Sequence, residues 1–586
     1  MLCLVTPRKA VEVTPSTPTT SIRPDVQTLR DRGEVDVLII GGGINGLATL
    51  RDLALQGVSV ALVERGDFVS GASSASSHMV HGGIRYLENG EFRLVKEAVT
   101  ERNGLLKTAP HYVRPLQTTI PIYKTFSGIL SAPFRLLVTH GRGKPNERGA
   151  VLIKIGLVIY DTFSRGGGTV PRHKFLGRKK SLAEFPEMNP DLKYTATYYD
   201  ASMYDPERLA LDVMHDGIVA GDGRATAVNY VSAIGSSERG VRMRDELSGE
   251  EFDVAAKVIV NASGPWTDLT NDAIGMPTKF MGGTKGSHVV LENEELLEAT
   301  KGREIFFEHS DGRIVLIYPL KGRVLVGTTD IDADPAKPVV TTDEEIDYFF
   351  ELIGHVFPKI PVDRSQIVYT FSGIRPLPRH DDTAPGFVSR DYRIVQETHD
   401  KTPVLSLVGG KWTTFRALAE NLSTKTLEVI GLPHRVSTAG LPIGGGAGFP
   451  KGAAARKRWA KTHAAGHSIE LVEQMLVRYG TRATEILAVL PVGAQPLEHA
   501  PTYYREELAH LAETEQVVHL IDVLLRRTSL AFVGGMSEQT LREVAEAVAA
   551  PLGWDTDRQA EEVAQTVEIL RTAHLVEFEE VGTAHA

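Results

Sequence analysis

Three glycines near the start of the chain, Gly41, Gly43 and Gly46, have the G-x-G-x-x-G spacing of loops that bind the pyrophosphate of a dinucleotide. In such a loop the first glycine permits a tight turn, the second lets backbone N–H groups approach the phosphates, and the third lets the next helix pack closely. Glu64 follows about 20 residues later, where an acid accepts hydrogen bonds from ribose hydroxyls and disfavours the 2′-phosphate of NADP. These residues predict dinucleotide binding without separating FAD from NAD.

The elements that must position this loop are visible as hydrophobic patterns. Residues 35–40 form a β-branched apolar run, which is typical of a buried parallel strand. Leu47, Leu50 and Leu53 mark one face of a helix, and residues 58–64 predict a second strand. The stretch therefore predicts one strand–helix–strand unit, with the partial positive charge of the helix N-terminus directed at the phosphates.

Three further segments have the composition of backbone that approaches a ligand closely. Residues 70–92 are rich in serine, alanine and glycine, and residues 258–270 combine an apolar strand with a glycine-containing turn. Residues 404–422 predict a strand, a Gly409-Gly410 turn and a helix. Because this last pattern comes so long after the first unit, it indicates a nucleotide-binding domain assembled from distant segments.

Composition excludes several classes of function. The formal net charge of −10 argues against a general nucleic-acid-binding protein. Cys3 is the one cysteine of the sequence, so an internal disulfide and a cysteine-built metal or redox site are excluded, and any redox chemistry needs a bound cofactor. The apolar run 151–160 is about half of the 18–20 residues that cross a bilayer, so we expect no membrane-spanning segment.

One HxxxH pattern occurs, from His463 to His467, and on a helix it would place both imidazoles on one face. It is separate from every catalytic motif, and no acid lies between the histidines. We therefore expect two solvent-exposed histidines on a helix and no metal site.

Several motifs together carry a family resemblance. They are the GxGxxG loop, NASGPW (261–266), HGGIRYLE (81–88), SGIRPL (372–377), SRDY (389–392), GGKWTT (409–414) and the helical segment IDVLLRRTSLAF (521–532). With these motifs the chain, from about residue 35 to its end, resembles the FAD-dependent glycerol-3-phosphate dehydrogenases among the flavoproteins related to D-amino-acid oxidase. It departs from that pattern at His78, where lysine is usual, and at Trp412, where a smaller residue is common.

The resemblance implies an α/β fold, in which a Rossmann-like FAD-binding domain is interleaved with an antiparallel-sheet substrate cap and followed by a C-terminal helical domain. We expect residues 1–33 to form a disordered N-terminal tail and residues 34–435 to hold the first two domains. The FAD-binding domain is expected in segments of about 34–115, 205–280 and 370–435, and the cap in about 116–204 and 281–369. A linker rich in glycine, proline and alanine at 436–450 precedes the helical domain at 451–580.

The candidate substrate site is built from arginines. A phosphate dianion needs fixed cationic donors, and the planar fork of arginine binds two oxygens at once. The resemblance places Arg85, Tyr86, Arg313, Arg375 and Arg390 around the substrate.

The catalytic residues that we expect are His288, Arg375 and Lys411. Imidazole has an ordinary pKa of about 6.5 and can accept a proton near neutrality, and the resemblance at KGSHVV (285–290) implies His288 as the candidate base. His81 is its rival, although we favour packing against the flavin for His81. Lys411 and the helix that begins at Thr413 suit the negative charge of a reduced flavin.

The cofactor that the resemblance implies is FAD, held without a covalent bond. The residues expected to bind it are Gly41, Gly43, Gly46, Glu64, Ser73, Ser77, His81, Gly82, Gly83, Gly264, Trp266, Gly410, Lys411, Thr413 and Thr414.

The implied reaction is oxidation of sn-glycerol 3-phosphate to dihydroxyacetone phosphate, with hydride passing from C2 to flavin N5 and electrons then passing to a membrane quinone. The resemblance also implies a monotopic protein on an anionic membrane surface, at the cytoplasmic, inner face of the cell membrane. Residues 126–163 mix apolar runs with cations and suit such a surface, but buried helices with a solvated loop explain the pattern equally well. A homodimer is left open, and nucleic acid is not expected as a partner.

Two alternatives stay open. One is a flavin oxidase that uses O2 on a related hydroxy acid or amino acid, because a single carboxylate needs fewer arginines than a phosphate. The other is a flavin-binding regulatory protein without turnover. The joint presence of Arg85, His288, Arg375 and Lys411 argues against the second.

Overall fold

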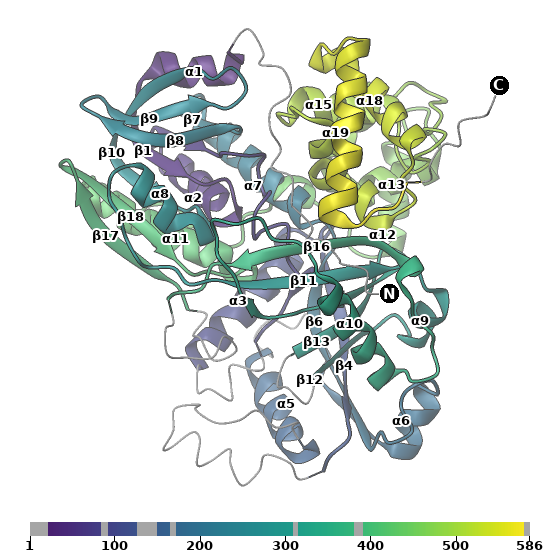
Figure 1. Ribbon diagram of the computed structural model, residues 1–586. Coiled ribbons are helices and arrows are strands. Elements are labelled where there is room, and N and C mark those ends of the chain that lie inside the picture. Colours follow the sequence, from purple (N-terminus) through teal and green to yellow (C-terminus); the bar gives the residue numbers. More distant parts are fainter. Residues whose placement is uncertain are drawn as a thin grey trace, which may run out of the picture.

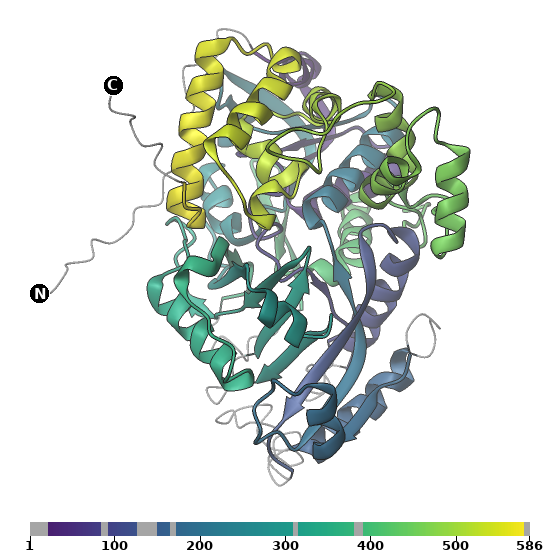
Figure 2. The ribbon, with the colours of Figure 1, turned by 90° about the vertical axis from the view of Figure 1, so that its right-hand side faces the viewer.

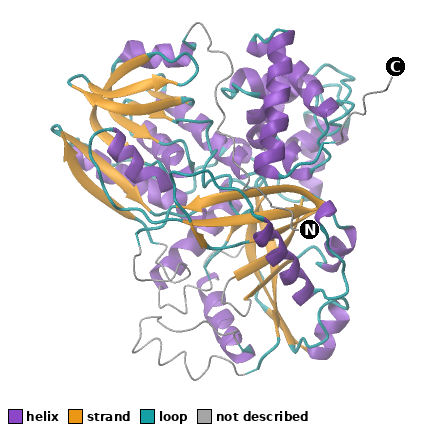
Figure 3. Ribbon diagram, viewed as in Figure 1, coloured by secondary structure: helices purple, strands orange, loops and turns teal. Residues whose placement is uncertain are grey.

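The structure is a computed structural model that describes residues 22–83, 92–125, 149–164, 171–308, 314–379 and 391–578. Figure 1 shows three parts: a sheet with its helices at the upper left, a second sheet with its helices below, and a group of helices at the upper right. In Figure 3 the strands gather in the first two of these parts. This is the mixed α/β architecture with a C-terminal helical domain that the sequence predicts.

The first sheet has, among the described residues, eight strands in the order β17-β18-β10-β1-β2-β7, with β8 and β9 attached at β10. The five strands β18, β10, β1, β2 and β7 run parallel, and β17 is an antiparallel edge. Strand β1 is central and apolar on both faces, as expected for a parallel strand that is covered on both sides. The bounds are β1 (Glu34–Ile40), β2 (Val60–Val63), β7 (Ala225–Val228), β8 (Val231–Ser237), β9 (Gly240–Asp245), β10 (Glu251–Asn261), β17 (Arg393–His399) and β18 (Thr402–Val408).

Helices cover both faces of the first sheet. One face packs against α2 (Ile44–Leu55), α7 (Pro206–Gly221) and α11 (Phe415–Val429), and the leucines of the predicted helical stripe are buried there. The other face is covered by the β8–β9 hairpin, α1 (Pro24–Arg32) and α8 (Thr267–Ala273). The order β1, α2, β2 confirms the strand–helix–strand unit that positions the glycine loop.

Helix α1 corrects the predicted disordered tail, which was drawn through residue 33. Pro24 stands in its first turn, where the fixed φ of proline suits a helix, and Val26 and Leu29 are buried against the sheet. The Nη1 of Arg23 also donates to Oδ1 of Asn229 at 2.7 Å. Two apolar residues on one face are enough to dock a short helix, and the surrounding threonines and prolines hide that signal. Residues 1–21 lie outside the described part of the chain.

The second sheet forms the predicted cap. Its described residues make ten strands in the order β15-β11-β14-β13-β12-β4-β6-β3, with β16 paired to β11 and β5 paired to β6. These pairs are antiparallel apart from β12 with β4. The bounds are β3 (Met79–Val80), β4 (Val113–Ile122), β5 (Lys174–Gly177), β6 (Tyr194–Met203), β11 (Thr284–Leu291), β12 (Glu304–Glu308), β13 (Ile314–Leu320), β14 (Arg323–Gly327), β15 (Ile331–Asp332) and β16 (Ile367–Arg375).

Two groups of helices cover the second sheet. One group packs with the β11–β14 region, and the other packs with β4 and β6. The first comprises α6 (Arg178–Glu184), α9 (Glu294–Ala299) and α10 (Asp343–Val356), and the second α3 (Phe92–Thr108) and α5 (Ala150–Ser164).

Two strands of this sheet lie outside the predicted bounds of the cap. β3 falls in the predicted segment 34–115, and most of β16 falls in 370–435, yet both pair with cap strands. The chain crosses between the sheets inside continuous motifs, so no change of composition marks either crossing.

The helical domain packs against both other parts, and Figure 2 shows its green and yellow helices across the upper side of the molecule. Its core includes Tyr369 and Phe371 of β16, so the domain shares a hydrophobic core with the cap. The helices are α12 (Ala453–Thr462), α13 (Ile469–Tyr479), α14 (Ala483–Val489), α15 (Arg505–Thr514), α16 (Leu520–Asp522), a π-helical turn (Val523–Arg527), α17 (Leu530–Val533), α18 (Glu538–Leu552) and α19 (Thr556–His574).

The linker 436–450 is packed and not a flexible spacer. Ile443 is buried, and a Cβ on Gly445 would meet the carbonyl oxygen of Tyr479 at 2.0 Å. A Cβ on Gly446 would meet the carbonyl oxygen of Thr108 at 2.0 Å. The glycines that suggest flexibility in the sequence are here required by close contact between backbones on both sides.

The HxxxH pattern does not lie on one helix. α12 ends at Thr462, so His463 and His467 follow its C-terminus. His463 stacks on Trp459, and His467 is buried with Nε2 at 3.2 Å from the carbonyl oxygen of Leu487. The expected pair of exposed histidines on a helix face is therefore wrong. Across the described ranges no helix has both the length and the apolar character to cross a membrane.

Candidate functional site

The candidate cofactor site lies at the carboxyl ends of four adjacent parallel strands. Gly41 follows β1, Glu64 follows β2, Ala262 follows β10 and Gly409 follows β18. Because parallel strands end at the same edge of a sheet, these four turns meet there, and this is the edge where open α/β sheets bind ligands. Strand order alone thus brings together the glycine loop with its Glu64 and two motifs that are far away in the sequence, NASGPW and GGKWTT.

The glycine loop is packed too tightly for side chains. Gly41 has φ +115° and a Cβ there would meet backbone atoms of Ala262 and Ser263 at 2.7–2.8 Å. A Cβ on Gly46 would come within 2.0 Å of the carbonyl oxygen of Gly41. On Gly43, by contrast, a Cβ would meet just the Ser73 hydroxyl, at 3.2 Å. The first and third glycines are therefore fixed by the fold, and the middle one faces the site.

Glu64 is bonded to the loop it was expected to assist. One carboxylate oxygen accepts from the N–H of Gly42 at 2.7 Å and the other accepts from the N–H of Gly66 at 2.9 Å. Burial raises the pKa of Glu64, and these two backbone bonds act in the opposite direction. Each carboxylate oxygen has a further lone pair, so Glu64 can still accept from a ligand hydroxyl.

The serine-rich segment 70–78 lies against the N-terminus of α2. The Ser73 hydroxyl accepts from the N–H of Ile44 at 3.0 Å, and the Ser73 carbonyl accepts from Nε1 of Trp412 at 2.8 Å. A Cβ on Gly410 would meet Nδ2 of Asn45 at 2.7 Å. Trp412, which departs from the family pattern, thus fastens the GGKWTT motif to this segment.

Trp266 closes another side of the same region. Its Nε1 donates to the carbonyl of Pro335 at 2.9 Å, and the guanidinium of Arg65 lies 5.7 Å from the ring centroid. A Cβ on Gly71 would meet the ring at 2.8 Å, so the serine-rich segment runs directly over the indole. Gly264, with φ +63°, begins the turn that presents Trp266.

His288 lies where the cap meets the serine-rich segment. Its Nε2 is hydrogen-bonded to the hydroxyl of Ser77 at 2.8 Å, and its ring stacks on Phe371 at 4.6 Å with an interplanar angle of 12°. A Cβ on Gly327 would collide with the imidazole at 2.2 Å, so Gly327 makes room for the ring. Burial lowers the pKa of His288 well below 6.5, assisted by Arg375 and His78. The imidazole is therefore neutral near pH 7.

Arg375 lies on the same face of the cap sheet as His288. β16 pairs with β11 so that Arg375 is opposite Thr284 and Phe371 is opposite His288, and the guanidinium lies over Gly286. The group donates to Asp330 at 3.0 Å and to the hydroxyl of Thr328 and the carbonyl of Thr329 at 2.9 Å. These bonds fix a cation beside His288, and the role of Arg375 toward a substrate stays a prediction.

Lys411 and the two threonines that follow it stand at the start of α11. Thr413 and Thr414 are buried in the 3-10 turn Trp412–Thr414 that leads into the helix, and Lys411 is its N-cap residue. The partial positive charge of this helix start therefore faces the same edge of the sheet. Burial raises the pKa of Glu97 on α3, and the nearby ammonium of Lys411 acts in the opposite direction.

Gly82 has a structural reason for being glycine that the sequence does not reveal. A Cβ there would meet the hydroxyl of Tyr160 at 2.1 Å, and the Gly82 N–H donates to Asp200 at 2.9 Å. Its neighbours His81 and Gly83, with φ +74° at Gly83, continue this packed segment. The contact of Gly82 is thus with α5 and β6, and binding of FAD by residues 81–83 stays a prediction.

Four predicted substrate residues lie outside the described part of the chain. They are Arg85, Tyr86, Arg313 and Arg390.

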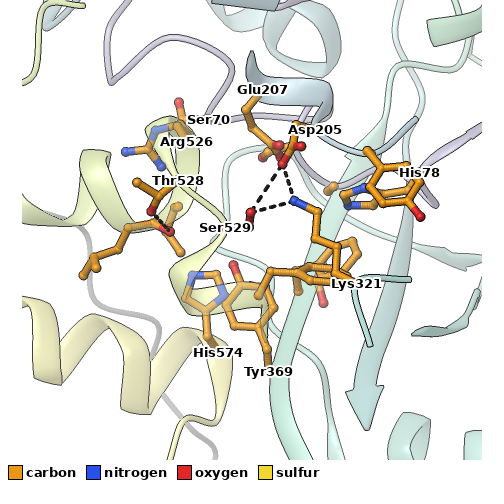
Figure 4. Close-up of a pocket in the computed structure, with 18 residues that line it drawn as sticks. Ser70, His78, Asp205, Glu207, Lys321, Tyr369, Arg526, Thr528, Ser529 and His574 are labelled. Carbon is orange, nitrogen blue, oxygen red and sulfur yellow. Dashed lines mark hydrogen bonds and ion pairs between the residues drawn. The ribbon is translucent and has the colours of Figure 1, made fainter. Parts of the chain in front are cut away.

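A cavity of about 190 Å³ lies between the serine-rich segment, β16 and the helical domain. Figure 4 shows His78, Lys321, Asp205 and Arg526 around it. Ser70 and Ser74 line this cavity, whereas Ser73 and Ser77 bond to the glycine loop and to His288, so the segment separates the two spaces. Burial lowers the pKa of His78 to about 4, and Nδ1 of this residue bonds the carbonyl of Met203 at 3.1 Å.

Sequence reasoning missed two functional neighbours. Phe371 supports the His288 ring, and its position two residues before the SGIRPL glycine was the available signal, because alternate residues of a strand share a face. The bond from Trp412 to Ser73 joins segments so far apart that no local pattern could show it.

Two family profiles match the chain. The profile described as FAD dependent oxidoreductase matches residues 36–416, and the profile described as the C-terminal domain of alpha-glycerophosphate oxidase matches residues 436–559. Together they cover the two sheets and most of the helical domain.

Two relatives of the chain are both named as glycerol-3-phosphate dehydrogenases. A glycerol-3-phosphate dehydrogenase of Synechocystis sp. is 33% identical over 85% of this chain and 89% of its own length. The aerobic glycerol-3-phosphate dehydrogenase of Staphylococcus haemolyticus is 28% identical over 90% of this chain and 93% of its own. A solved structure of the glycerol-3-phosphate dehydrogenase from Bacillus halodurans, complexed with FAD, has a TM-score of 0.71 at 23% identity and covers 94% of this chain and 97% of that one, which shows a shared fold.

The residues of the site fit FAD. The glycine loop leaves Gly43 open at the N-terminus of α2, which suits a pyrophosphate. Oδ1 of Asn45 beside that loop and Nδ1 of His288 are buried polar atoms without a protein partner among the described residues, as expected where a bound group supplies the partner. Sequence, fold and site therefore agree that this chain belongs to the family of FAD-dependent glycerol-3-phosphate dehydrogenases.

Proposed function

We propose that the protein oxidises sn-glycerol 3-phosphate to dihydroxyacetone phosphate and that the electrons pass to a membrane quinone. FAD supplies the hydride acceptor in this chemistry. The observation that carries the proposal is the pairing of a neutral histidine with a fixed arginine. Both lie on one face of the cap sheet, and His288 is bonded to the segment that packs on the glycine loop.

The two side chains suit different parts of the substrate. His288 can accept the proton of the substrate hydroxyl at an imidazole nitrogen, because its lowered pKa keeps it unprotonated near neutrality. The guanidinium of Arg375, held by Asp330 and Thr328, is a cation that need not reorganise when an anionic substrate arrives. Lys411 at the start of α11 is proposed to favour negative charge on the flavin.

Anaerobic titration of the purified holoprotein tests the reaction. Addition of glycerol 3-phosphate should bleach the flavin absorbance, whereas glycerol, which lacks the phosphate, should leave it unchanged. Absence of bleaching by glycerol 3-phosphate would overturn the proposal. Rapid reoxidation by a water-soluble quinone analogue, with slow reoxidation by O2, would support the quinone as acceptor, and the opposite order would identify an oxidase.

The proposal of a membrane-surface protein rests on α5. Val151, Ile155 and Val158 have 36, 54 and 49% exposed surface and lie on one stripe of this helix. The opposite face, with Leu157 and Tyr160, is buried in the protein. Such a helix presents an apolar stripe to the outside while its other face fixes it to the cap.

Exposed cations lie on α5, β5 and α6, three elements that all contact β6. Lys154 lies between the apolar residues of α5, and Lys174 and the α6 residues Arg178, Lys179 and Lys180 are exposed. Figure 1 shows both helices at the lower end of the molecule, α5 near the middle and α6 toward the right. Apolar side chains among cations favour a bilayer that carries anionic lipid, and we propose that this end contacts the inner face of the cell membrane.

Vesicle flotation tests the surface. The protein should float with vesicles that contain anionic lipid and bind neutral vesicles weakly. The double variant Ile155→Asp/Val158→Asp should lower binding to anionic vesicles at least about tenfold, since burial of one such side chain contributes about 1.5–3 kcal/mol. Val492→Asp is the matched control, because Val492 is 69% exposed in the helical domain. Equal binding of the parent protein, the α5 double variant and Val492→Asp to anionic vesicles would contradict the assignment of α5 as the membrane contact.

A further inference from the structure

The turn that follows β2 supports the glycine loop from one side. Glu64 accepts from the N–H of Gly42 at 2.7 Å, and the N–H of Val69 donates to the carbonyl of Gly42 at 3.0 Å. Phe68 is buried, and a Cβ on Gly42 would meet its ring at 2.8 Å. The loop at Gly42 and the turn 64–69 therefore form one packed unit, and displacement of the turn would displace the loop.

Asp67, in the middle of this turn, is held by the helical domain. Its carboxylate bonds to Arg526 and Arg527, which lie 459 and 460 positions away in sequence. Nη2 of Arg527 donates to one carboxylate oxygen at 2.9 Å and to the carbonyl of Glu515 at 2.7 Å. Asn229 donates to the same carboxylate at 2.9 Å. Asp67 has 2% exposed surface and Arg527 none, so this contact is shielded from water.

A π-helical turn explains how two successive arginines reach one carboxylate. On an α-helix, neighbouring residues point in directions about 100° apart. Residues 523–527 form a wider π turn, closed by a bond from the Thr528 N–H to the carbonyl of Val523 at 2.9 Å. π turns of this kind are rare and occur mainly at functional sites. Arg526 also donates to Asp522 at 2.6 Å, so two arginines and two carboxylates balance in charge.

We propose that Arg526 and Arg527 are positioning residues for FAD: by holding Asp67 they fix the turn that carries Glu64 and supports Gly42. The helical domain is then part of the cofactor-binding machinery, although it contributes no residue to the glycine loop.

The direction of the contacts supports this role over simple adhesion between domains. Both arginines bond to Asp67, which lies three residues from Glu64 in the turn that carries this acid. Arg526 also lines the cavity beside Ser70, as Figure 4 shows, and Ser70 begins the segment that reaches Ile44 through Ser73. Burial would raise the pKa of Asp67, but the two guanidiniums hold it at about 2, so the carboxylate stays ionised.

Release of FAD from the full-length holoprotein tests the proposal. After dilution, free FAD is followed by its fluorescence, and the dissociation constant is obtained by adding FAD back to stripped protein. Arg527→Gln should weaken FAD binding about 5- to 150-fold, the usual range for coupling between sites. Asp67→Asn, which can still accept from Asn229, should act in the same direction. In the double variant, the loss of FAD-binding free energy should be smaller than the sum of the losses in the two single variants, because each change removes the same contact.

Arg482→Gln is the matched control. Arg482 of the helical domain forms an ion pair with Asp212 of α7 at 2.7 Å, and neither residue is bonded to Asp67, Arg526 or Arg527 in the described part of the chain. If the arginine pair acts on the cofactor site, Arg482→Gln should bind FAD within about threefold of the parent protein. Unchanged FAD affinity in Arg527→Gln and Asp67→Asn, or equal weakening in Arg482→Gln, would overturn the proposal.

Discussion

At the scale of single residues, the environment of His288 decides what it can do. A histidine on the surface would be partly protonated near pH 6.5, whereas burial and the nearby Arg375 keep this one neutral. Its bond to Ser77 and its stacking on Phe371 restrict the ring to one orientation. A fixed, unprotonated imidazole is the form that a base requires.

Replacement of His288 should therefore affect the chemical step and spare the cofactor. In His288→Gln we expect the rate of flavin reduction by glycerol 3-phosphate, measured anaerobically in a single turnover, to fall about 10²–10⁴-fold, with unchanged FAD content. His574→Gln is the control, because His574 is a second histidine with a lowered pKa, about 4, and it stacks on Tyr369 of β16, the strand that also carries Phe371. Reduction of the His288→Gln flavin at the rate of the parent protein would exclude His288 as the base.

Glu304 gives the protein a pH dependence of stability that is separate from the site. This carboxyl is fully buried at the start of β12, accepts from Thr118 at 2.8 Å, and has its pKa raised to about 8 by burial. At pH values between about 4.5 and 8, this carboxyl stays protonated in the folded state, whereas it is ionised in the unfolded chain. Stability from this group is therefore complete below about pH 4.5 and is lost as the pH rises toward 8.

The variant Glu304→Gln should lose this dependence. Between pH 5 and 8 we expect the free energy of unfolding of this variant to decline less than that of the parent protein, by up to about 1.4 kcal/mol for each pH unit. Thermal unfolding at pH 5, 6.5 and 8 measures the difference. Glu513→Gln, at an exposed position of α15, should follow the parent protein. A constant gap between Glu304→Gln and the parent across this range would refute the assignment.

Residue types were predictable from the sequence, but their partners were not. The spacing of one motif predicted the glycines and Glu64, whereas His288 was predicted from the family resemblance. The bonds from Trp412 to Ser73 and from Arg527 to Asp67 join residues hundreds of positions apart, and only the fold brings them together. The helical segment 521–532, which carries the two arginines, was part of the family resemblance, whereas no local pattern indicated its contact with the turn 64–69.

At the scale of elements, α2 and its loop show how a helix can be positioned by the absence of a side chain. Gly46 lets the first turn of α2 approach the carbonyl of Gly41, where a Cβ would have only 2.0 Å. The sequence predicted this strand, loop and helix because a short β-branched apolar run gives way, after the glycines, to a hydrophobic period of 3.6 residues. It missed α1 and the pairing of β16 with the cap, because a short amphipathic helix and a strand inside a motif leave no such change.

Gly46→Ala should therefore damage FAD binding and leave the rest of the protein folded. Overpacking of this kind costs about 1–3 kcal/mol, and we expect at least about a tenfold loss of FAD affinity because the loop must move away from the helix. Fluorescence titration of stripped protein measures it. Gly104→Ala in α3 is the control, since a Cβ there meets no atom within 4 Å. Equal FAD affinity in the two variants would show that the helix start tolerates a methyl group.

At the scale of the whole molecule, the three parts are joined at the predicted linker, which is rich in glycine, proline and alanine. The linker glycines Gly445 and Gly446 lie against the backbones of Tyr479 and Thr108, which belong to the helical domain and to α3. Gly480 in turn faces the carbonyl of Gly445, where a Cβ would have 2.3 Å. Glycine in a linker can mean freedom or close contact, and composition alone cannot separate these two meanings.

Gly445→Ala tests whether this contact fixes the helical domain. A Cβ 2.0 Å from the carbonyl of Tyr479 must force the linker away, so limited proteolysis should cut near residues 436–452 faster than in the parent protein. FAD should be released faster as well, because the shift of the helical domain also loosens Arg527 from Asp67. Gly448→Ala is the control: its φ of +66° adds strain of about 1–2 kcal/mol, but its Cβ meets no atom within 4 Å. Faster proteolysis without faster FAD release would show that the helical domain can move while the turn 64–69 stays fixed. That result would contradict the proposed role of the helical domain in FAD binding.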